Sequence, residues 1–309
     1  MTFLLILKRL RKYVKITLRS VLFIGRLPAQ RSKYMEITLT DLLFIIGFLV
    51  VLVLIPGYIF YIKPFFVRRR RAEIQAEPTP GQWEEILQTH FTQFQKLPIP
   101  LREELKNKIK VFLHEKKFHG VHDLEITDTM RVLIAAQACL LLLNRETNFY
   151  PKLVTVIVYP SAYVSKHSAG PVFGESWNSG ELVLTWDSTL HGATNMFDGK
   201  NVVYHEFAHQ LDQEDGSADG APILERRSAY SSWAAVLGEE YETLISKKKR
   251  HRKTVLRKYG ATNPAEFFAV ATEAFFEKPR QLDKRHPELY QELKEYYKVD
   301  PLDWLNQAL

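Results

Sequence analysis

The chain has 309 residues, 46% of them hydrophobic, and a formal net charge of +7. The charge is unevenly distributed: residues 1–71 contain 14 Lys and Arg against two acidic residues, and the rest contains 28 against 33. A mildly acidic body behind a basic, apolar leader favours a membrane surface and argues against a nucleic-acid partner. The single cysteine, Cys139, excludes an intrachain disulfide and agrees with a reducing compartment.

Residues 1–41 are predicted to form a basic amphipathic leader. One helical face is apolar and the opposite face basic, a pattern typical of helices that lie on an anionic leaflet. The apolar residues are Leu7, Leu10, Val14, Leu18 and Val21, and the basic ones are Lys8, Arg11, Lys12, Lys15 and Arg19. An alternative hypothesis is that translation begins at Met35, which would leave a short acidic terminus.

Residues 42–62 contain no charged side chain over 21 positions and are predicted to form a transmembrane helix. At about 1.5 Å per residue, this length crosses a hydrocarbon core of about 30 Å. Pro56 predicts a kink, which membrane spans tolerate. A basic flank and a polar linker follow over residues 63–82, including Arg68–Arg71. These arginines predict a single-pass protein of an inner or plasma membrane, with its body on the cytoplasmic side.

Residues 83–309 are predicted to form one α+β domain with a small sheet and a helical core. Apolar periodicity predicts helices over 83–118, 129–144, 200–213, 225–246, 264–277 and 287–297. β-Branched runs predict strands over 153–160 and 179–186, with a Gly/Ser/His-rich loop at 165–178 between them. The run 129–144 is apolar nearly all round, yet its 16 residues are too few for a second span, so we expect a buried core helix.

The segment HEFAH, which begins at His205, is the strongest chemical signal in the chain. His205 and His209 lie one helical turn apart on the same face, so both imidazoles reach one metal ion. Glu206 is rotated by about 100° from His205 and stands beside the ion without ligating it. This pattern indicates metal-assisted peptide hydrolysis, in which zinc activates water and the glutamate accepts its proton. The alternative is an ordinary helix that carries two histidines.

A catalytic zinc ion takes a third protein ligand, and two glutamates of the segment 261–276 are candidates. Glu266 also stands where a capping-box glutamate belongs, because Asn263 and Pro264 are typical of a helix start. Glu273 lies seven residues later, on nearly the same helical face. The spacing alone leaves the third ligand open between Glu266 and Glu273.

Five separated blocks resemble the Mlc titration factor A family of zinc peptidases, in order, from about residue 83 to 305. The blocks are HEFAHQLD, DQEDGSADGAP, KYGATNPAEFFAVATEAFF, VIVYPSAYV and SGELVLTW. The resemblance implies a zincin-like fold in which zinc is held by His205, His209 and Glu266, so it selects Glu266 over Glu273. It also implies that Glu206 is the catalytic base and that Tyr259 lies near the metal. A phenol there could donate to the oxyanion.

Three features allow more than one interpretation. The strand 179–186 either offers an edge to an extended peptide or is an ordinary sheet strand. The acidic loop DQEDGSADG lacks the calcium-hand spacing and is expected to be a polar turn. The basic run 247–253 is expected to be a solvated helix end.

These features together predict a membrane-anchored zinc metallopeptidase that hydrolyses peptides as an amino- or oligopeptidase. Its expected partners are a peptide or protein substrate and the lipid bilayer. The rival prediction is a non-catalytic interaction protein that uses a zinc-stabilised fold to bind a regulatory protein such as a transcriptional repressor. A nucleotide-binding enzyme finds no support, because the chain lacks a glycine-rich phosphate loop.

Overall fold

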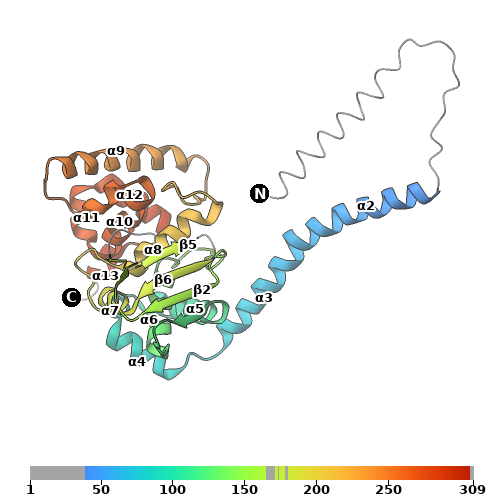
Figure 1. Cartoon of the computed structure of the whole chain (residues 1–309), viewed down its shortest axis with the longest axis horizontal. Helices are drawn as coiled ribbons and strands as arrows, with labels where there is room; N and C mark the ends of the chain where they lie inside the picture. Colours follow the sequence, from blue (N-terminus) through green and yellow to red (C-terminus); the bar gives the residue numbers. More distant parts are fainter. Residues whose placement is uncertain (1–38, 165–170, 173, 178–179, 307–309) are drawn as a thin grey trace, which may run out of the picture. The chain divides into compact units, whose positions relative to one another are not determined.

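The structure is a computed structural model that describes residues 39–164, 171–172, 174–177 and 180–306. The chain separates into two compact units, Met1–Phe66 and Val67–Leu309. Nearly all of the predicted leader, residues 1–38, lies outside the described residues, as does the alternative start at Met35. Figure 1 shows the chain coloured along its sequence, with helices and strands labelled where there is room.

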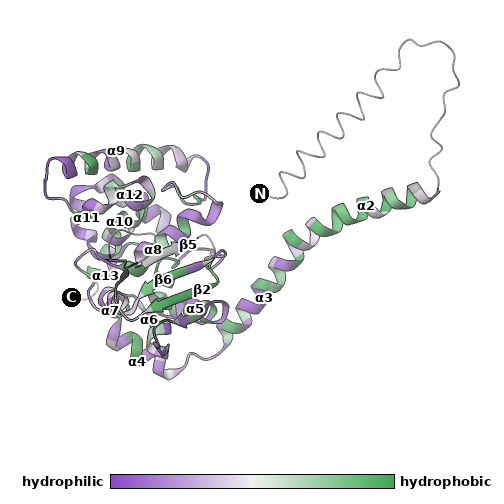
Figure 2. Ribbon diagram, in the orientation of Figure 1, coloured by the Kyte–Doolittle hydropathy of each residue, from purple (hydrophilic) through white to green (hydrophobic). Residues whose placement is uncertain are grey.

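The first described element is the apolar helix α2 (Leu39–Gly57), which continues into a π-helical turn η1 (Tyr58–Ile62). The hydrophobic side chains of α2 that the structure describes between Leu42 and Ile55 are exposed, and Figure 2 shows this helix as mostly hydrophobic. Pro56 lies in the last turn of α2, directly before the π-turn. Proline removes an amide donor, which explains why the regular hydrogen-bond ladder changes there. A helix from Leu42 to Ala76 is long and apolar enough to cross a membrane.

Within the predicted basic flank and linker 63–82, residues 77–80 are non-helical and lie between two helices that extend into this range. Helix α3 (Lys63–Ala76) extends to Ala76, and helix α4 (Gly81–His90) begins five residues later. The last turns of α3 are stabilised by the second unit: Ile74 is buried, and Lys110 Nζ donates to the carbonyls of Gln75 and Glu77. These contacts stabilise the end of the helix, whereas the Pro-containing stretch 77–80 remains non-helical.

The second unit contains a four-stranded sheet in the order β1-β2-β6-β5. Strands β1 (Lys117–Gly120), β2 (Thr155–Tyr159) and β6 (Glu181–Thr185) are parallel, and β5 (Gly174–Trp177) pairs antiparallel with β6. The pairs Val156–Leu182 and Val158–Leu184 are fully buried, so the centre of the sheet forms part of the core. Figure 2 shows β2 and β6 as its most hydrophobic strands.

The sheet decides between the two interpretations of the predicted strand 179–186 and corrects the predicted loop 165–178. Strand β6, within the predicted strand 179–186, is hydrogen-bonded on both sides and therefore offers no edge to a peptide; that edge belongs to β5. The predicted loop 165–178 contains β4 (Pro171–Val172) and β5. Strand β4 pairs with β3 (Tyr163–Val164), and the remaining loop residues 165–170, 173 and 178 lie outside the described residues. The sequence did not predict β5, because this strand contains glycine and serine, which are poor strand formers.

The predicted helix over 83–118 is several elements. Helix α4 is followed by the short 3₁₀ helix η2 (Phe94–Lys96), then by α5 (Ile99–Glu115), and Lys117 already belongs to β1. The run predicted to be a buried helix is α6 (Asp128–Leu140), whose apolar residues are fully buried from Val132 onward. The α+β prediction is confirmed at this level: a small, mostly parallel sheet lies in a largely helical unit.

Helices dominate the C-terminal half. They are α7 (Trp186–Thr194), α8 (Val202–Asp212), η3 (Gln213–Asp215), α9 (Ala229–Lys249), η4 (Lys258–Ala261), α10 (Pro264–Glu277), α11 (Pro279–Arg285), α12 (Pro287–Tyr297) and α13 (Pro301–Asn306). The predicted spans 264–277 and 287–297 agree with α10 and α12. Figure 1 shows α9 to α12 gathered at one end of this unit and α4 to α6 at the other, with α8 next to β5.

Candidate metal centre

Helix α8 carries the HEFAH segment and is fixed at its start and along its buried face. The Asn201 side chain accepts a hydrogen bond from Tyr204 N at 2.9 Å, which caps the helix. Phe207 is fully buried, and its ring lies 4.7 Å from that of Tyr150 and 5.7 Å from that of Phe112. This apolar anchoring leaves His205 and His209 on the side of α8 that faces α10.

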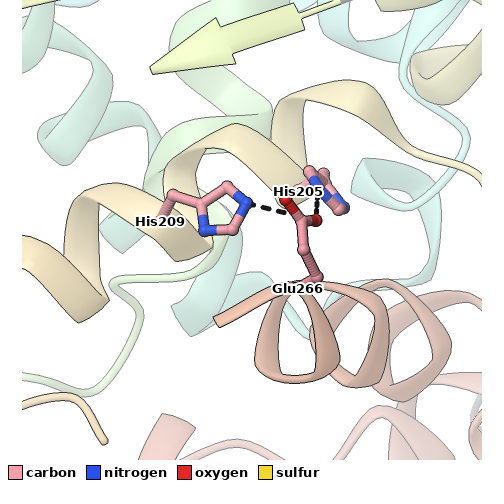
Figure 3. Close-up of side chains that lie close together, drawn as sticks. All are labelled: His205, His209 and Glu266. Atoms are coloured by element: carbon pink, nitrogen blue, oxygen red, sulfur yellow. Dashed lines mark hydrogen bonds and ion pairs between the residues drawn. The ribbon is translucent and has the colours of Figure 1, made fainter. Parts of the chain in front are cut away.

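Helix α10 supplies Glu266 from its first turn. The Asn263 side chain accepts a hydrogen bond from Glu266 N at 2.9 Å, and Pro264 occupies the first helical position. The helix cap predicted from the sequence is therefore present, but Glu266 takes part in it only through its main-chain amide. The Glu266 carboxylate turns towards α8 and lies between the two imidazoles (Figure 3).

His205, His209 and Glu266 converge on one point. Glu266 Oε2 lies 2.9 Å from His205 Nε2 and 3.5 Å from His209 Nε2. All three donor atoms lie within 4.8 Å of one another. Ligands bound to zinc at about 2.0–2.2 Å in a tetrahedron lie about 3.3 Å apart, so the two measured distances bracket the required spacing. Two imidazoles and one carboxylate are also the donor types that zinc takes in catalytic sites.

No other grouping of three or more possible metal ligands occurs in the described part of the chain. The acidic loop after α8, all of which is described, begins with the 3₁₀ helix η3 and a left-handed Gly216, so it forms a turn, as expected. Lys248–Lys253 of the basic run are exposed at the end of α9, as expected for a solvated helix end.

The charges of the cluster are strongly coupled. Burial opposes the charged form of His205, but the hydrogen bonds that the imidazole donates to Glu266 and Glu273 outweigh it and raise the pKa of this group to about 10. Burial likewise opposes ionisation of Glu266, yet the two histidines hold its pKa far below the usual range. The imidazole of His205 and the carboxylate of Glu266 thus favour each other's charged forms.

Glu206 follows His205 and is also buried, with 6% of its surface exposed. Burial raises the pKa of its carboxyl group, which the charges of His205 and His209 partly offset. These charges act on Glu206 because it lies close to the cluster. A carboxylate with a raised pKa beside a metal-ligand cluster is suited to accept a proton.

Tyr259 lies in η4, at the exposed rim of the cluster. Its hydroxyl donates to Glu266 Oε1 at 3.3 Å, and its ring lies 5.8 Å from that of His205. Partial burial, together with the charge of Glu266, raises the pKa of the phenol to about 12. Tyr259 therefore remains a hydrogen-bond donor at neutral pH.

Glu273, the alternative third ligand, lies on the other side of His205. Its Oε1 is 2.7 Å from His205 Nδ1, whereas Glu266 faces Nε2 of the same ring. Arg257 and Asn201 also contact Glu273, and the sequence pattern predicted neither contact. The seven-residue spacing of Glu266 and Glu273 was the available signal, because it places two carboxylates on one face of α10.

Comparison with known proteins identifies the family. A model of the glucose-regulated metallo-peptidase M90 family matches residues 65–298. An uncharacterised protein of Synechocystis sp. is 40% identical over 267 residues, which covers 82% of this chain and 97% of that protein. Mlc titration factor A of Serratia proteamaculans is 32% identical over 250 residues, covering 74% of this chain and 90% of that protein. Mlc titration factor A of Yersinia pestis is 29% identical over 238 residues, covering 72% and 86%. These matches confirm the resemblance found in the sequence blocks, and the chain belongs to the glucose-regulated metallo-peptidase M90 family.

Proposed function

We propose that this protein is a zinc-dependent peptidase with a zincin-like catalytic domain over residues 83–309, acting as an amino- or oligopeptidase. The observation that carries the proposal is the convergence of His205, His209 and Glu266 within 4.8 Å, with buried Glu206 next to them on α8. When bound, zinc supplies a Lewis acid that polarises the scissile carbonyl and makes water a stronger nucleophile at neutral pH.

The residues of the chain have separate tasks in this proposal. Glu206 accepts a proton from the attacking water and delivers it to the leaving amine as the C–N bond breaks. Burial favours this role, because it raises the pKa of the carboxyl group. Tyr259 donates a hydrogen bond to the carbonyl oxygen as negative charge develops on it. Its hydroxyl already points to the cluster through Glu266 Oε1.

The edge strand β5 is the proposed binding element for the substrate main chain. It packs beside α8, which carries the histidines, and its one hydrogen-bonded neighbour among the described residues is β6. An extended peptide that pairs with this edge would be recognised mainly through its backbone. Such recognition supports broad selectivity for exposed chain ends and short peptides.

The proposed membrane anchor is the segment 42–62, followed by the basic flank within 63–82. The exposed apolar surface of α2 supports this assignment, because 21 uncharged residues in water would leave a large hydrophobic surface unpaired. The arginines Arg68–Arg71 favour a cytoplasmic catalytic domain at an inner or plasma membrane. Translation from Met35 would agree with this orientation, and a peptide from residues 1–34 in mature protein would exclude that start.

The test is hydrolysis by the purified full chain in detergent, with and without zinc, on unblocked chromogenic amino acids and short peptides. We expect turnover that requires zinc and that Glu206→Gln abolishes, while Glu242→Gln, an exposed position on α9, leaves it unchanged. Zinc content is measured for each variant, so that loss of the base is distinguished from loss of the metal. Turnover by Glu206→Gln at the wild-type rate would contradict the mechanism.

A non-catalytic role is the second candidate, because the relatives from Serratia proteamaculans and Yersinia pestis are named Mlc titration factor A. In this alternative, zinc stabilises a fold whose surface binds a regulatory protein such as a transcriptional repressor. The same assay separates the two candidates. If wild type and Glu206→Gln both bind zinc, both lack turnover and both retain one purified regulatory protein in pull-downs, the binding role is supported over the peptidase.

A further inference from the structure

We propose that Glu273 is a positioning residue of the metal centre, which fixes the ring of His205 and, through Arg257, the turn that carries Tyr259. The inference rests on the proposed function, because it assigns a role around the same metal cluster. Glu273 lies in the middle of α10, and its side chain has no exposed surface. Its carboxylate contacts Nδ1 of His205, whereas the proposed ligand Glu266 contacts Nε2, so Glu273 is not placed to bind the same metal ion.

The first contact fixes the tautomer of His205. Glu273 Oε1 lies 2.7 Å from Nδ1, and because a carboxylate only accepts, Nδ1 carries a hydrogen. The other nitrogen, Nε2, then has its lone pair available for a metal, and it is the atom that faces Glu266. A carboxylate behind a ligating histidine orients the ring and increases its basicity.

Two further donors complete the environment of this carboxylate. Asn201 N donates to Glu273 Oε2 at 2.9 Å, and the guanidinium of Arg257 donates to Oε1. A buried carboxylate is stable only when its oxygens are paired, so these contacts explain how a negative charge is tolerated here. Asn201 is also the N-cap of α8, so Glu273 holds the beginning of the helix that carries both histidines.

Arg257 connects Glu273 to the opposite side of the site. It directly precedes η4, the turn that contains Tyr259, and its partly buried guanidinium donates to the fully buried carboxylate of Glu273. The turn is therefore anchored by the same carboxylate that orients His205. One side chain thus determines the placement of a metal ligand and of the proposed oxyanion donor.

Glutamine cannot replace this carboxylate, although it has nearly the same shape. The two oxygens of Glu273 face donors only: His205 and Arg257 on Oε1, Asn201 N on Oε2. A glutamine has one acceptor oxygen and one NH2 group, so in either amide orientation the NH2 group meets a donor. We therefore expect Glu273→Gln to weaken the orientation of His205 even if the fold is preserved.

The matched control is Glu277→Gln, one helical turn later on α10. Glu277 is also buried, and its Oε2 accepts a hydrogen bond from Lys200 N at 2.9 Å, but it contacts none of the three proposed ligands. Zinc affinity is measured for the full chain by competition with a chromophoric chelator. We expect Glu273→Gln to bind zinc about 10- to 100-fold more weakly than wild type, and Glu277→Gln to remain within about twofold.

Two further readouts separate positioning from general damage. In cobalt-substituted protein, the visible d–d absorption band should shift in Glu273→Gln and stay unchanged in Glu277→Gln, because the band reports ligand geometry. With saturating zinc, kcat should fall more than KM rises, since Tyr259 is displaced along with His205. Far-UV circular dichroism and a thermal melt verify that each variant is folded.

A second variant covers the case in which Glu273→Gln does not fold. Arg257→Met leaves the contact between Glu273 and His205 in place and removes the anchor of the Tyr259 turn. We expect it to reduce kcat about tenfold or more while zinc affinity changes less than about tenfold. Wild-type kcat in Arg257→Met would overturn the second half of the proposal.

The outcomes distinguish this inference from the proposed function. If wild type binds zinc and folded Glu273→Gln binds it equally well with an unchanged cobalt band, the inference is overturned and the peptidase proposal stands. If wild type binds zinc without hydrolysing any peptide, the peptidase proposal fails, and affinity and spectrum still decide the role of Glu273. If wild type binds no zinc, both fail.

Discussion

Tyr259 is the most exposed of the proposed site residues, with 52% of its surface accessible, and its hydroxyl depends on one contact with Glu266. We predict that Tyr259→Phe lowers kcat about 100- to 1000-fold, as the loss of one oxyanion donor does in other hydrolases. KM and zinc affinity should change little, because the phenol donates only to charge that develops during the reaction.

The control for this variant is Tyr241→Phe. Tyr241 lies in α9 and packs against Phe267 of α10. Among the interactions that the structure describes, it contacts none of the proposed ligands. Steady-state kinetics at saturating zinc provide the measurement. Equal kcat values for Tyr259→Phe and Tyr241→Phe would exclude the oxyanion role.

The buried carboxyl group of Glu277 predicts how the stability of the protein depends on pH. Burial, and then the neighbouring charge of Glu273, raises the pKa of Glu277 to about 8 from its ordinary 4.5. The folded state therefore binds more protons than the unfolded state between these values. The stability that the protonated carboxyl provides is fully present below about pH 4.5 and is lost as the pH rises through about 8.

Glu277→Gln should remove this loss, because glutamine does not titrate. We expect the free energy of unfolding of the variant to exceed that of wild type at pH 9 by on the order of 4 kcal/mol, relative to their difference at pH 5. Urea unfolding at both pH values provides the measurement. A difference between the two proteins that does not depend on pH would show that Glu277 is already ionised in the folded state at pH 5.

At the level of elements, Gly220 joins the ends of three helices. Its amide donates to Asp212 Oδ2 of α8 at 3.0 Å, and its carbonyl accepts from Trp233 Nε1 of α9 at 3.0 Å. A Cβ at this position would lie 2.5 Å from the carbonyl oxygen of Pro264, which begins α10. The backbone of Gly220 also has a φ of +79°, which disfavours any other residue.

Gly220→Ala should therefore displace the start of α10 and with it Glu266. The control is Gly216→Ala in the same loop, where φ is +108° but the nearest atom to a new Cβ is Lys152 Nζ at 4.0 Å. We expect about 1 kcal/mol of destabilisation for Gly216→Ala and at least about 2 kcal/mol for Gly220→Ala. Only Gly220→Ala should also weaken zinc binding, and equal effects in both variants would contradict this role.

Local signals in the sequence were sufficient to predict some helices but not every element of the fold. The bounds of α10 and α12 agree with prediction because Pro264 and Pro287 begin these helices, and proline at the first helical position is a local cue. Strand β1 was missed because its four residues are mostly exposed and lack an apolar pattern. The last turn of α3, which ends at Ala76, is stabilised by a hydrogen bond from Lys110 Nζ to the carbonyl of Gln75. Because Lys110 is distant in sequence, no local pattern predicts this contact.

The same distinction applies to the candidate site. The pairing of His205 and His209 follows from helical spacing, so the sequence alone could predict it. The convergence of Glu266 depends on how α10 packs against α8, and only the family resemblance supplied it. The role of Glu273 depends on contacts with Asn201 and Arg257 from two other elements, which no local pattern encodes.

For the whole molecule, the central question outside residues 83–309 is whether residues 42–62 anchor the chain in a bilayer. We predict that the double variant Val50→Arg, Val53→Arg is no longer found in the carbonate-resistant membrane fraction. Each arginine near the centre of a span raises the free energy of membrane insertion by about 3 kcal/mol. Ala76→Arg, which adds an arginine outside the proposed span, should remain in that fraction. Retention of the double variant would contradict a spanning helix.

The proposal as a whole depends on one zinc ion held between α8 and α10. Diffraction from zinc-loaded crystals of the full chain, collected on both sides of the zinc absorption edge, locates such an ion directly. We predict one anomalous peak about 2.0–2.2 Å from His205 Nε2, His209 Nε2 and a carboxylate oxygen of Glu266. A zinc peak on other residues, or no peak between these three side chains, would contradict the account.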